Sequence, residues 1–172
     1  MTIQGSSYTQ PMIDPTHILF IHGSGGDRSQ TYKARLLRGI FPGMLTPDFE
    51  GELPERMQQL ETVLGKETGW TLVGSSLGGL MAVLFAAAHP GQVRKLVLLA
   101  PALTIPEYME SLSFQISIPT IIVQGKRDEL IPLEPARALA GKIFTRLTYI
   151  TVEDDHRLHK TAEELDWKNL LE

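Results

Sequence analysis

Short apolar runs alternate with longer amphipathic stretches along the whole chain. The short runs end in glycine, proline or charged residues, which is typical of buried strands. These predicted strands lie at residues 17–23, 43–51, 70–76, 93–101, 119–125 and 147–153. The longer stretches place apolar residues three and four apart, which is typical of helices packed on one face. These predicted helices lie at residues 29–40, 54–69, 78–91, 132–143 and 156–172.

The sequence gives further detail for three of the predicted helices: how one begins, how deeply one is buried and which face of one is apolar. Pro54 occupies a favourable position in the first turn of its helix. The stretch at residues 78–91 is apolar nearly all round, which predicts a central helix. The tail at residues 156–172 predicts one closing amphipathic helix, whose apolar face is formed by Leu158, Ala162, Leu165 and Leu170.

The regular alternation of strand and helix predicts an α/β fold. We expect a mainly parallel sheet of about six strands with helices on both faces. No repeat, linker or low-complexity segment divides the chain, so residues 1–172 are expected to form a single domain. In such sheets the ligand crevice lies outside the carboxyl ends of the strands. Functional residues are therefore expected just after strands.

Composition narrows the class of protein further. The 172 residues are 42% hydrophobic and 21% charged, with a net charge of −4, so a globular domain without affinity for nucleic acid is expected. The absence of cysteine excludes disulfides and thiolate chemistry. Residues 1–16 form a polar leader without the features of a secretory signal, and residues 80–88 are too few to cross a bilayer. We expect a cytoplasmic protein without a membrane span.

Candidate chemistry begins at the end of the third predicted strand. Gly74-Ser75-Ser76-Leu77-Gly78 matches G-x-S-x-G between a strand and a helix, the context in which this motif presents a nucleophilic serine. The turn would be tight and strained, and side chains at the two flanking positions would collide with it. The other interpretation is a turn that is merely small. Ser75 is the weaker nucleophile candidate, because neither residue two positions away is glycine.

A serine nucleophile requires a base and an orienting acid. Asp128 follows the fifth predicted strand and His156 follows the last one, so the order is serine, acid, histidine. An aspartate in such a loop is often only a turn residue, and a lone histidine is often structural. The agreement of residue type, order and placement favours the functional interpretation. The neighbouring acids are too local to contact the back of the imidazole; they are Glu153, Asp154 and Asp155.

The loop after the first strand supplies a candidate oxyanion hole. Its backbone can bend at Gly23, so the N–H of Ser24 is expected to act beside that of Leu77, with Gly25 as the fallback. His22 is expected to brace this loop by hydrogen bonding. A glycine-rich loop can also bind phosphate, but this one lacks both G-x-G-x-x-G and a Walker lysine.

The remaining histidines are given structural interpretations. His159 is expected at the surface, His17 at the start of a strand and His89 at the end of a helix. No group of histidine and acidic residues has the spacing of a metal site, so neither a metal nor a cofactor is expected.

Taken together, the motifs resemble those of the α/β-hydrolase superfamily. They are a strand followed by H-G-x-G, the G-x-S-x-G turn, G-x-x-D-x-x-x-P at residues 125–132, and a late Asp-His pair. The resemblance runs from Ile18 to the C-terminus and is greatest to compact bacterial esterase-like members, including the retinoblastoma-binding-protein-like serine hydrolases. It implies a Ser76 nucleophile, a His156 base and an Asp128 acid, with Ser24 and Leu77 in the oxyanion hole.

Two departures from the superfamily pattern shape the expected site. Only about sixteen residues precede the H-G strand, so the usual initial antiparallel pair is not expected. Residues 102–117, where larger members carry a cap, have room for one short helix and no lid. The crevice should therefore be open and suit small or extended acyl groups. Five residues of this segment are expected to form the apolar wall of the crevice, although they could equally pack beneath a loop. They are Leu103, Ile105, Tyr108, Met109 and Phe114.

The expected function is hydrolysis of an ester of a small molecule through an acyl-enzyme, without a cofactor. A thioesterase or amidase with the same mechanism is the nearest alternative. A non-catalytic binding protein on the same fold is the alternative from another class. The sequence does not distinguish leaving groups or oligomeric states.

Overall fold

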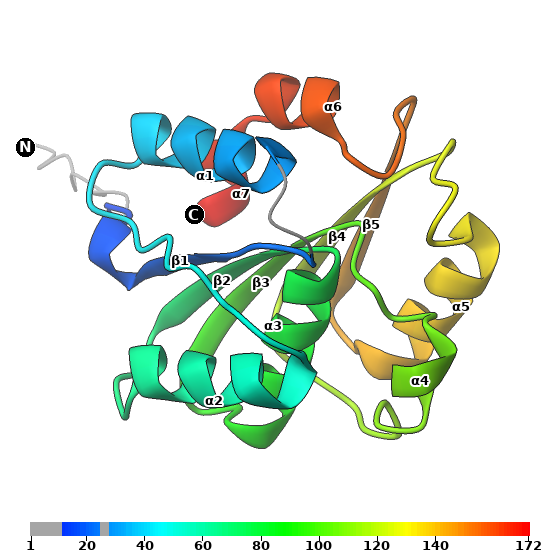
Figure 1. Ribbon diagram of the computed structural model, residues 1–172, viewed down its shortest axis with the longest axis horizontal. Helices are drawn as coiled ribbons and strands as arrows, with labels where there is room; N and C mark the ends of the chain where they lie inside the picture. The colour runs from blue at the N-terminus through cyan, green and yellow to red at the C-terminus, as the bar shows by residue number, and fades with distance from the viewer. Residues whose placement is uncertain (1–11, 25–27) are drawn as a thin grey trace, which may run out of the picture.

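The computed structural model describes residues 12–24 and 28–172. Its sheet has five strands: β1 (Ile18–Ile21), β2 (Trp70–Ser75), β3 (Val93–Leu99), β4 (Thr120–Gly125) and β5 (Leu147–Val152). Every neighbouring pair is parallel, and the order across the sheet is the order along the chain (Figure 1). The helices are α1 (Arg28–Ile40), α2 (Leu53–Leu64), α3 (Leu77–Ala88), α4 (Pro106–Met109), α5 (Leu133–Ile143), α6 (His159–Glu164) and α7 (Trp167–Leu171), and a 3₁₀ turn, η1 (Pro15–His17), precedes β1.

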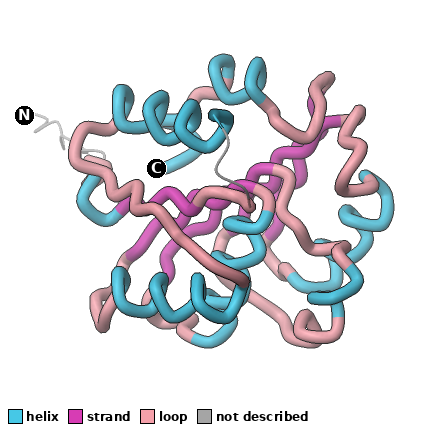
Figure 2. Tube along the Cα trace, viewed as in Figure 1, coloured by secondary structure: helices cyan, strands magenta, loops and turns pink. Residues whose placement is uncertain are grey.

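The helices form a layer on each face of the sheet. Helices α2, α3, α4 and α5 lie on one face, and α1, α6 and α7 lie on the other (Figures 1 and 2). Successive connections between parallel strands are right-handed, so steps in one direction across the sheet place their helices on the same face. The expected α/β class, with a parallel sheet and helices on both faces, is confirmed.

Successive residues of the strands belong to two apolar clusters, one on each face of the sheet. Leu19, Leu72 and Leu96 belong to the apolar cluster formed with α2, α3 and α5. Phe20 and Val97 belong to the cluster formed with α1, α6 and α7. Because side chains of a strand alternate between faces, a strand covered on both sides must be apolar at every position. All four residues of β1 are buried for this reason.

The expected sixth strand at residues 43–51 does not form. Leu45 makes a single parallel bridge to Leu19, with hydrogen bonds of 2.9 Å from Phe20 N to Leu45 O and from Leu45 N to Ile18 O. The ladder ends there because Pro47 has no N–H to donate. The segment therefore lies beside β1, but it contributes one bridge instead of the predicted strand.

The prediction of one closing helix is also wrong. The tail breaks between α6 and α7, where Leu165 has an extended backbone with a ψ of 135°. Asp166 then begins α7 by accepting a hydrogen bond from Asn169 N at 3.2 Å. The Trp167 indole donates to Ala162 O at 2.8 Å and holds the two short helices together. An N-cap aspartate thus overrides the apolar periodicity of the tail.

The segment expected in place of a cap is as small as predicted. Residues 102–117 contain the four-residue helix α4, and no cap domain formed by the described residues covers the carboxyl ends of the strands (Figure 1). Within the described part of the chain, no helix is long and apolar enough to cross a membrane. The organisation of residues 1–172 as one domain remains a prediction, and residues 1–11 of the polar leader lie outside the described residues.

Candidate active site

Ser76 lies at a strained turn between β2 and α3. Its backbone has a φ of 53° and a ψ of −116°, a conformation that non-glycine residues rarely adopt. The turn leaves no room beside it: a Cβ on Gly74 would lie 2.5 Å from Gly78 O, and one on Gly78 would lie 2.0 Å from Ile21 O. Glycine is therefore required at both flanking positions, as the motif predicts.

The structure brings Ser76, Asp128 and His156 together from three loops at the carboxyl edge of the sheet. His156 Nε2 lies 3.1 Å from Ser76 Oγ. On the other side of the ring, Nδ1 lies 2.9 and 3.0 Å from the two carboxylate oxygens of Asp128. The Asp128 side chain is fully buried, whereas that of His156 is 17% exposed. These distances allow a proton to pass from the serine to a histidine oriented by the aspartate.

The Asp128 carboxylate is itself held by its own loop. Its Oδ1 accepts hydrogen bonds from Leu130 N at 2.9 Å and Ile131 N at 2.8 Å. The loop is fixed in turn by Gln124, a fully buried residue of β4 that donates to Ile131 O at 2.7 Å and accepts a hydrogen bond from the Tyr149 hydroxyl. Burial raises the pKa of Tyr149 to about 12, so this hydroxyl remains a donor.

Sequence reasoning missed Gln124. The available signal is a lone amide in an otherwise apolar strand, because a buried polar side chain needs a partner.

The acids close to His156 in sequence have other partners. Asp154 accepts hydrogen bonds from the Thr161 N–H and hydroxyl and from Asp155 N. Burial alone would raise the pKa of Asp154, but these hydrogen bonds outweigh it and lower the pKa. Glu153 pairs with Lys126, whose hydrogen bond lowers the pKa of Glu153. The carboxylate that faces the imidazole is thus that of Asp128.

The loop after β1 is braced by two side chains. The His22 ring contacts Gly23 O through Nδ1 at 2.8 Å and accepts a hydrogen bond from Phe49 N at Nε2, also at 2.8 Å. Arg56, which is 2% exposed, donates to His22 O at 3.1 Å and to Gly23 O at 3.0 Å. The bracing role expected of His22 matches these bonds, whereas sequence reasoning missed Arg56, which looks like an ordinary polar position of an amphipathic helix.

The predicted oxyanion donors belong to two different segments. Leu77 is the first residue of α3, and Ser24 is an exposed residue of the braced loop. The fallback donor, Gly25, lies outside the described residues. A Cβ on Gly78 would lie 2.6 Å from His22 O, so the loop packs directly against the first turn of α3. The oxyanion roles of Ser24 and Leu77 remain predictions.

Two other polar residues have contacts that the sequence did not indicate. Ser75, the weaker nucleophile candidate, accepts a hydrogen bond at its Oγ from the buried Lys33 Nζ at 3.3 Å. His159, expected at the surface, is half-buried with its ring centroid 4.9 Å from that of Tyr32. Among the described residues, no cluster of histidine and acidic side chains is arranged to hold a metal ion.

The residues predicted to line the acyl pocket differ in how far they are exposed to solvent. Leu103 is 1% exposed and belongs to the core, Tyr108 is half-buried, and Met109 on α4 is 46% exposed. A cavity of 290 Å³ opens directly beside the imidazole, lined by Arg127, Glu129, Leu130, Asp155, His156 and Arg157. Whether Leu103, Tyr108 and Met109 contact substrate stays a prediction.

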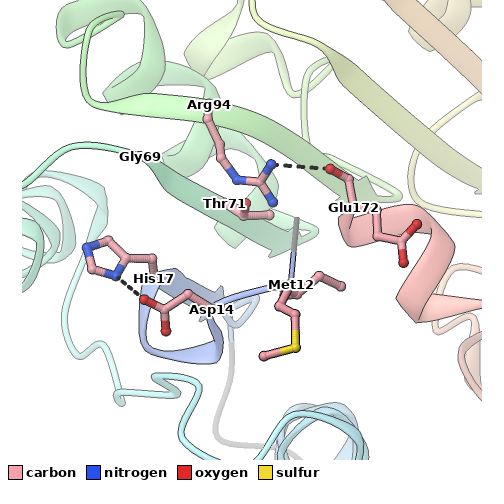
Figure 3. A pocket seen from close by; sticks show the side chains of 8 residues that line it. Met12, Asp14, His17, Gly69, Thr71, Arg94 and Glu172 are labelled. Atoms are coloured by element: carbon pink, nitrogen blue, oxygen red, sulfur yellow. Dashed lines mark hydrogen bonds and ion pairs between the residues drawn. The ribbon is translucent and has the colours of Figure 1, made fainter. Parts of the chain in front are cut away.

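A larger cavity, of 350 Å³, lies at the other end of the sheet. His17 precedes β1, while Thr71 and Arg94 lie near the beginnings of β2 and β3, so the amino ends of the strands form this cavity (Figure 3). His17 contacts Asp14 here, and Arg94 donates to the backbone carbonyl of Glu172 (Figure 3). The arrangement of Ser76, His156 and Asp128 lies at the carboxyl ends of the strands, beside the smaller of these two cavities.

Comparison with known proteins agrees with this architecture. A family model described as serine aminopeptidase, S33 matches residues 57–115, about a third of the chain. Est1E from Butyrivibrio proteoclasticus has a TM-score of 0.70 and 20% identity, with 90% of this chain and 84% of that chain covered. Alpha/beta hydrolase domain-containing protein 10 from mouse has a TM-score of 0.66 and 20% identity over 85% and 84%.

A third structure, the monoacylglycerol lipase of Paleococcus ferrophilus, has a TM-score of 0.65 and 15% identity over 90% of this chain and 93% of that one. No curated protein matches the sequence significantly. The protein has the α/β-hydrolase fold, in a compact form with a five-stranded parallel sheet and no cap. The resemblance inferred from its motifs is confirmed at this level.

Proposed function

We propose that the protein is a serine hydrolase that cleaves esters of small molecules through an acyl-enzyme. The observation that supports this most directly is the chain of contacts from Ser76 Oγ through the His156 ring to the buried Asp128 carboxylate. Chance proximity does not account for an imidazole with one nitrogen on a strained serine and the other on a fully buried acid.

The reaction follows from this geometry. His156 carries its proton on Nδ1, donated to Asp128, so that Nε2 is free to take the Ser76 hydroxyl proton as Oγ attacks the carbonyl carbon. The backbone N–H groups of Ser24 and Leu77 stabilise the negative oxygen of the tetrahedral intermediate. Collapse expels the alcohol, which takes the proton from Nε2. Water then attacks the acyl-enzyme with His156 again as base and releases the acid.

The open site favours small or extended acyl groups. In the described part of the chain, the segment after β3 contributes the short helix α4 and no cap domain, so little covers a bound ligand. The structural neighbour named as a monoacylglycerol lipase favours esters as the first substrates to test. The matching family model is named for an aminopeptidase, so amide substrates come second. We propose a cytoplasmic enzyme that needs no cofactor or nucleic acid.

The first test is labelling with a fluorophosphonate probe, followed by intact-mass measurement. We expect one adduct on the wild type and on Ser75→Ala, and none on Ser76→Ala. Ser75 is the matched control because it is a serine in the same turn. Absence of an adduct on folded wild type would contradict the proposal and favour the binding-protein alternative. Turnover of p-nitrophenyl acetate against an aminoacyl p-nitroanilide then separates esterase from amidase.

A further inference from the structure

Arg56 is a buried cation in the described part of the chain, and no carboxylate there pairs with it. It extends from the first turns of α2, is 2% exposed, and donates from Nη2 to two consecutive carbonyls, those of His22 and Gly23. Its Nε has no hydrogen-bond partner among the described residues. Burying a guanidinium without a counter-ion is costly, and it remains protonated at neutral pH. A hydrophobic side chain would fill the position at less cost, so the charge itself calls for an explanation.

The proton of the His22 ring can be assigned from its contacts. Because Phe49 N–H donates to Nε2, that nitrogen carries no proton, and the neutral ring is protonated at Nδ1. Nδ1–H therefore donates to Gly23 O at 2.8 Å. Arg56 Nη2 lies 3.0 Å from this nitrogen, but both groups are donors, so Arg56 makes its hydrogen bonds to the carbonyls instead. The Gly23 carbonyl thus accepts two hydrogen bonds, one from a neutral ring and one from the Arg56 cation.

The same peptide group contains the predicted oxyanion donor. Gly23 C=O and Ser24 N–H belong to one peptide unit, and in a trans peptide they point in opposite directions. Fixing the carbonyl on Arg56 therefore fixes the direction of the N–H, which points away from Arg56. Hydrogen bonds to the carbonyl also polarise the peptide and make its N–H a stronger donor.

We propose that Arg56 is a positioning residue for the oxyanion hole, which orients and polarises the Gly23–Ser24 peptide. The inference rests on the proposed function, because it assigns a role within the same site. The loop is enclosed from two sides: the Gly78 position of α3 leaves no space beside Ile21 O and His22 O, and Arg56 holds the carbonyls from α2. The N–H is thus set before substrate arrives, as electrostatic stabilisation requires.

Arg56→Met, with Arg94→Met as the matched control, tests the proposal. Arg94 also donates from one guanidinium to two consecutive carbonyls, those of Leu171 at 2.7 Å and Glu172 at 3.2 Å, but at the far end of the sheet. Losing a whole oxyanion donor costs about 10²–10³ in rate, and Arg56 acts through a donor that remains, so we expect kcat to fall about tenfold. KM should stay unchanged, and the affinity for a trifluoromethyl ketone should fall by the same factor as kcat.

The control separates this role from simple support of the fold. Arg94→Met should retain wild-type kcat and ketone affinity, and Arg56→Lys, which keeps the charge, should lie between the wild type and Arg56→Met. Unchanged kcat in folded Arg56→Met would overturn the proposal, as would a fall in kcat without loss of ketone affinity. If Arg56→Met does not fold, Arg56→Gln replaces it with the same expected outcomes.

A measurement that needs no activity distinguishes this inference from the proposed function. In wild type and in Arg56→Met, the Ser24 amide proton is followed by ¹⁵N–¹H correlation spectroscopy. Loss of the cation should move this proton upfield, because the peptide is less polarised. An unmoved Ser24 resonance overturns the role of Arg56 even in an active enzyme. A shifted resonance in a protein that fails fluorophosphonate labelling would show that Arg56 polarises the peptide, but it would contradict the hydrolase and with it the oxyanion role.

Discussion

The buried carboxylate of Asp128 offers a substitution whose outcome is set by the structure. In Asp128→Asn the side chain keeps its shape, but one oxygen becomes an NH₂ group. Oδ1 is held by Leu130 N and Ile131 N, which are both donors, so the amide oxygen must remain there. The NH₂ group is therefore placed at the Oδ2 position, 2.9 Å from His156 Nδ1. The amide oxygen at Oδ1 also lies 3.0 Å from Nδ1, but the nearer NH₂ group opposes a proton on that nitrogen, so we expect an unprotonated Nδ1 to be favoured.

The consequence is the wrong tautomer of His156. With its proton moved to Nε2, the ring would point a donor at Ser76 Oγ and could not take the serine proton. An aspartate-to-asparagine change of this kind in a serine triad costs roughly 10⁴ in kcat, or about 5.5 kcal/mol of transition-state stabilisation. We expect a loss of this size in p-nitrophenyl acetate hydrolysis, with KM within about threefold of wild type and an unchanged thermal transition.

Glu153→Gln is the matched control for this prediction. It makes the same chemical change in an exposed acid three residues before His156, whose partner is Lys126. Its kcat should equal that of the wild type. The tautomer itself is read from the ¹⁵N shifts of the His156 ring. If folded Asp128→Asn retains a tenth or more of wild-type kcat, or if its ring still carries the proton on Nδ1, the reasoning is refuted.

Two further predictions concern stability. Gly78→Ala should lower the free energy of unfolding by more than the usual 1–3 kcal/mol or so of overpacking, because the added Cβ meets backbone at 2.0 Å. A Cβ on Gly141 in α5 would meet nothing within 4 Å, so Gly141→Ala should instead raise the free energy of unfolding by about 0.5–1 kcal/mol. Urea denaturation measures the change in both variants. Equal effects would contradict the packing argument. Because hydrogen bonds from Thr161 and Asp155 lower the folded pKa of Asp154, its carboxylate stabilises the fold above the ordinary value of 3.8. Wild type should therefore exceed Asp154→Asn in stability at neutral pH, with a gap that narrows as pH falls below 3.8; a constant gap would contradict the assignment.

The five strands and the tight turn at Ser76 could be predicted from the sequence because each depends on a local pattern. Strands covered on both faces are apolar throughout, and G-x-S-x-G records a turn that excludes side chains. The failures have local causes that apolar periodicity does not register. Pro47 ends pairing after one bridge, and Asp166 restarts a helix in the middle of an apolar face.

The polar residues that support the site could not be predicted in the same way. Arg56 and Lys33 occupy helix positions where a charged residue normally faces solvent, yet both are buried. Their long side chains reach backbone or hydroxyl groups of segments far away in sequence, His22 and Gly23 for one and Ser75 for the other. Such contacts depend on how α1 and α2 pack on the sheet, which no single stretch of sequence encodes.

The agreement between strand order and chain order has a consequence for the emergence of the protein from the ribosome. Each strand made after β1 adds to the free edge beside its predecessor, so the sheet can grow from one side as synthesis proceeds. Ser76 follows the second strand, Asp128 the fourth and His156 the last. A nascent chain can therefore display its serine turn long before the proposed base and acid are made, and in the proposed mechanism the hydroxyl stays unreactive until β5 has joined. Labelling by an activity-based probe would then mark the completed sheet.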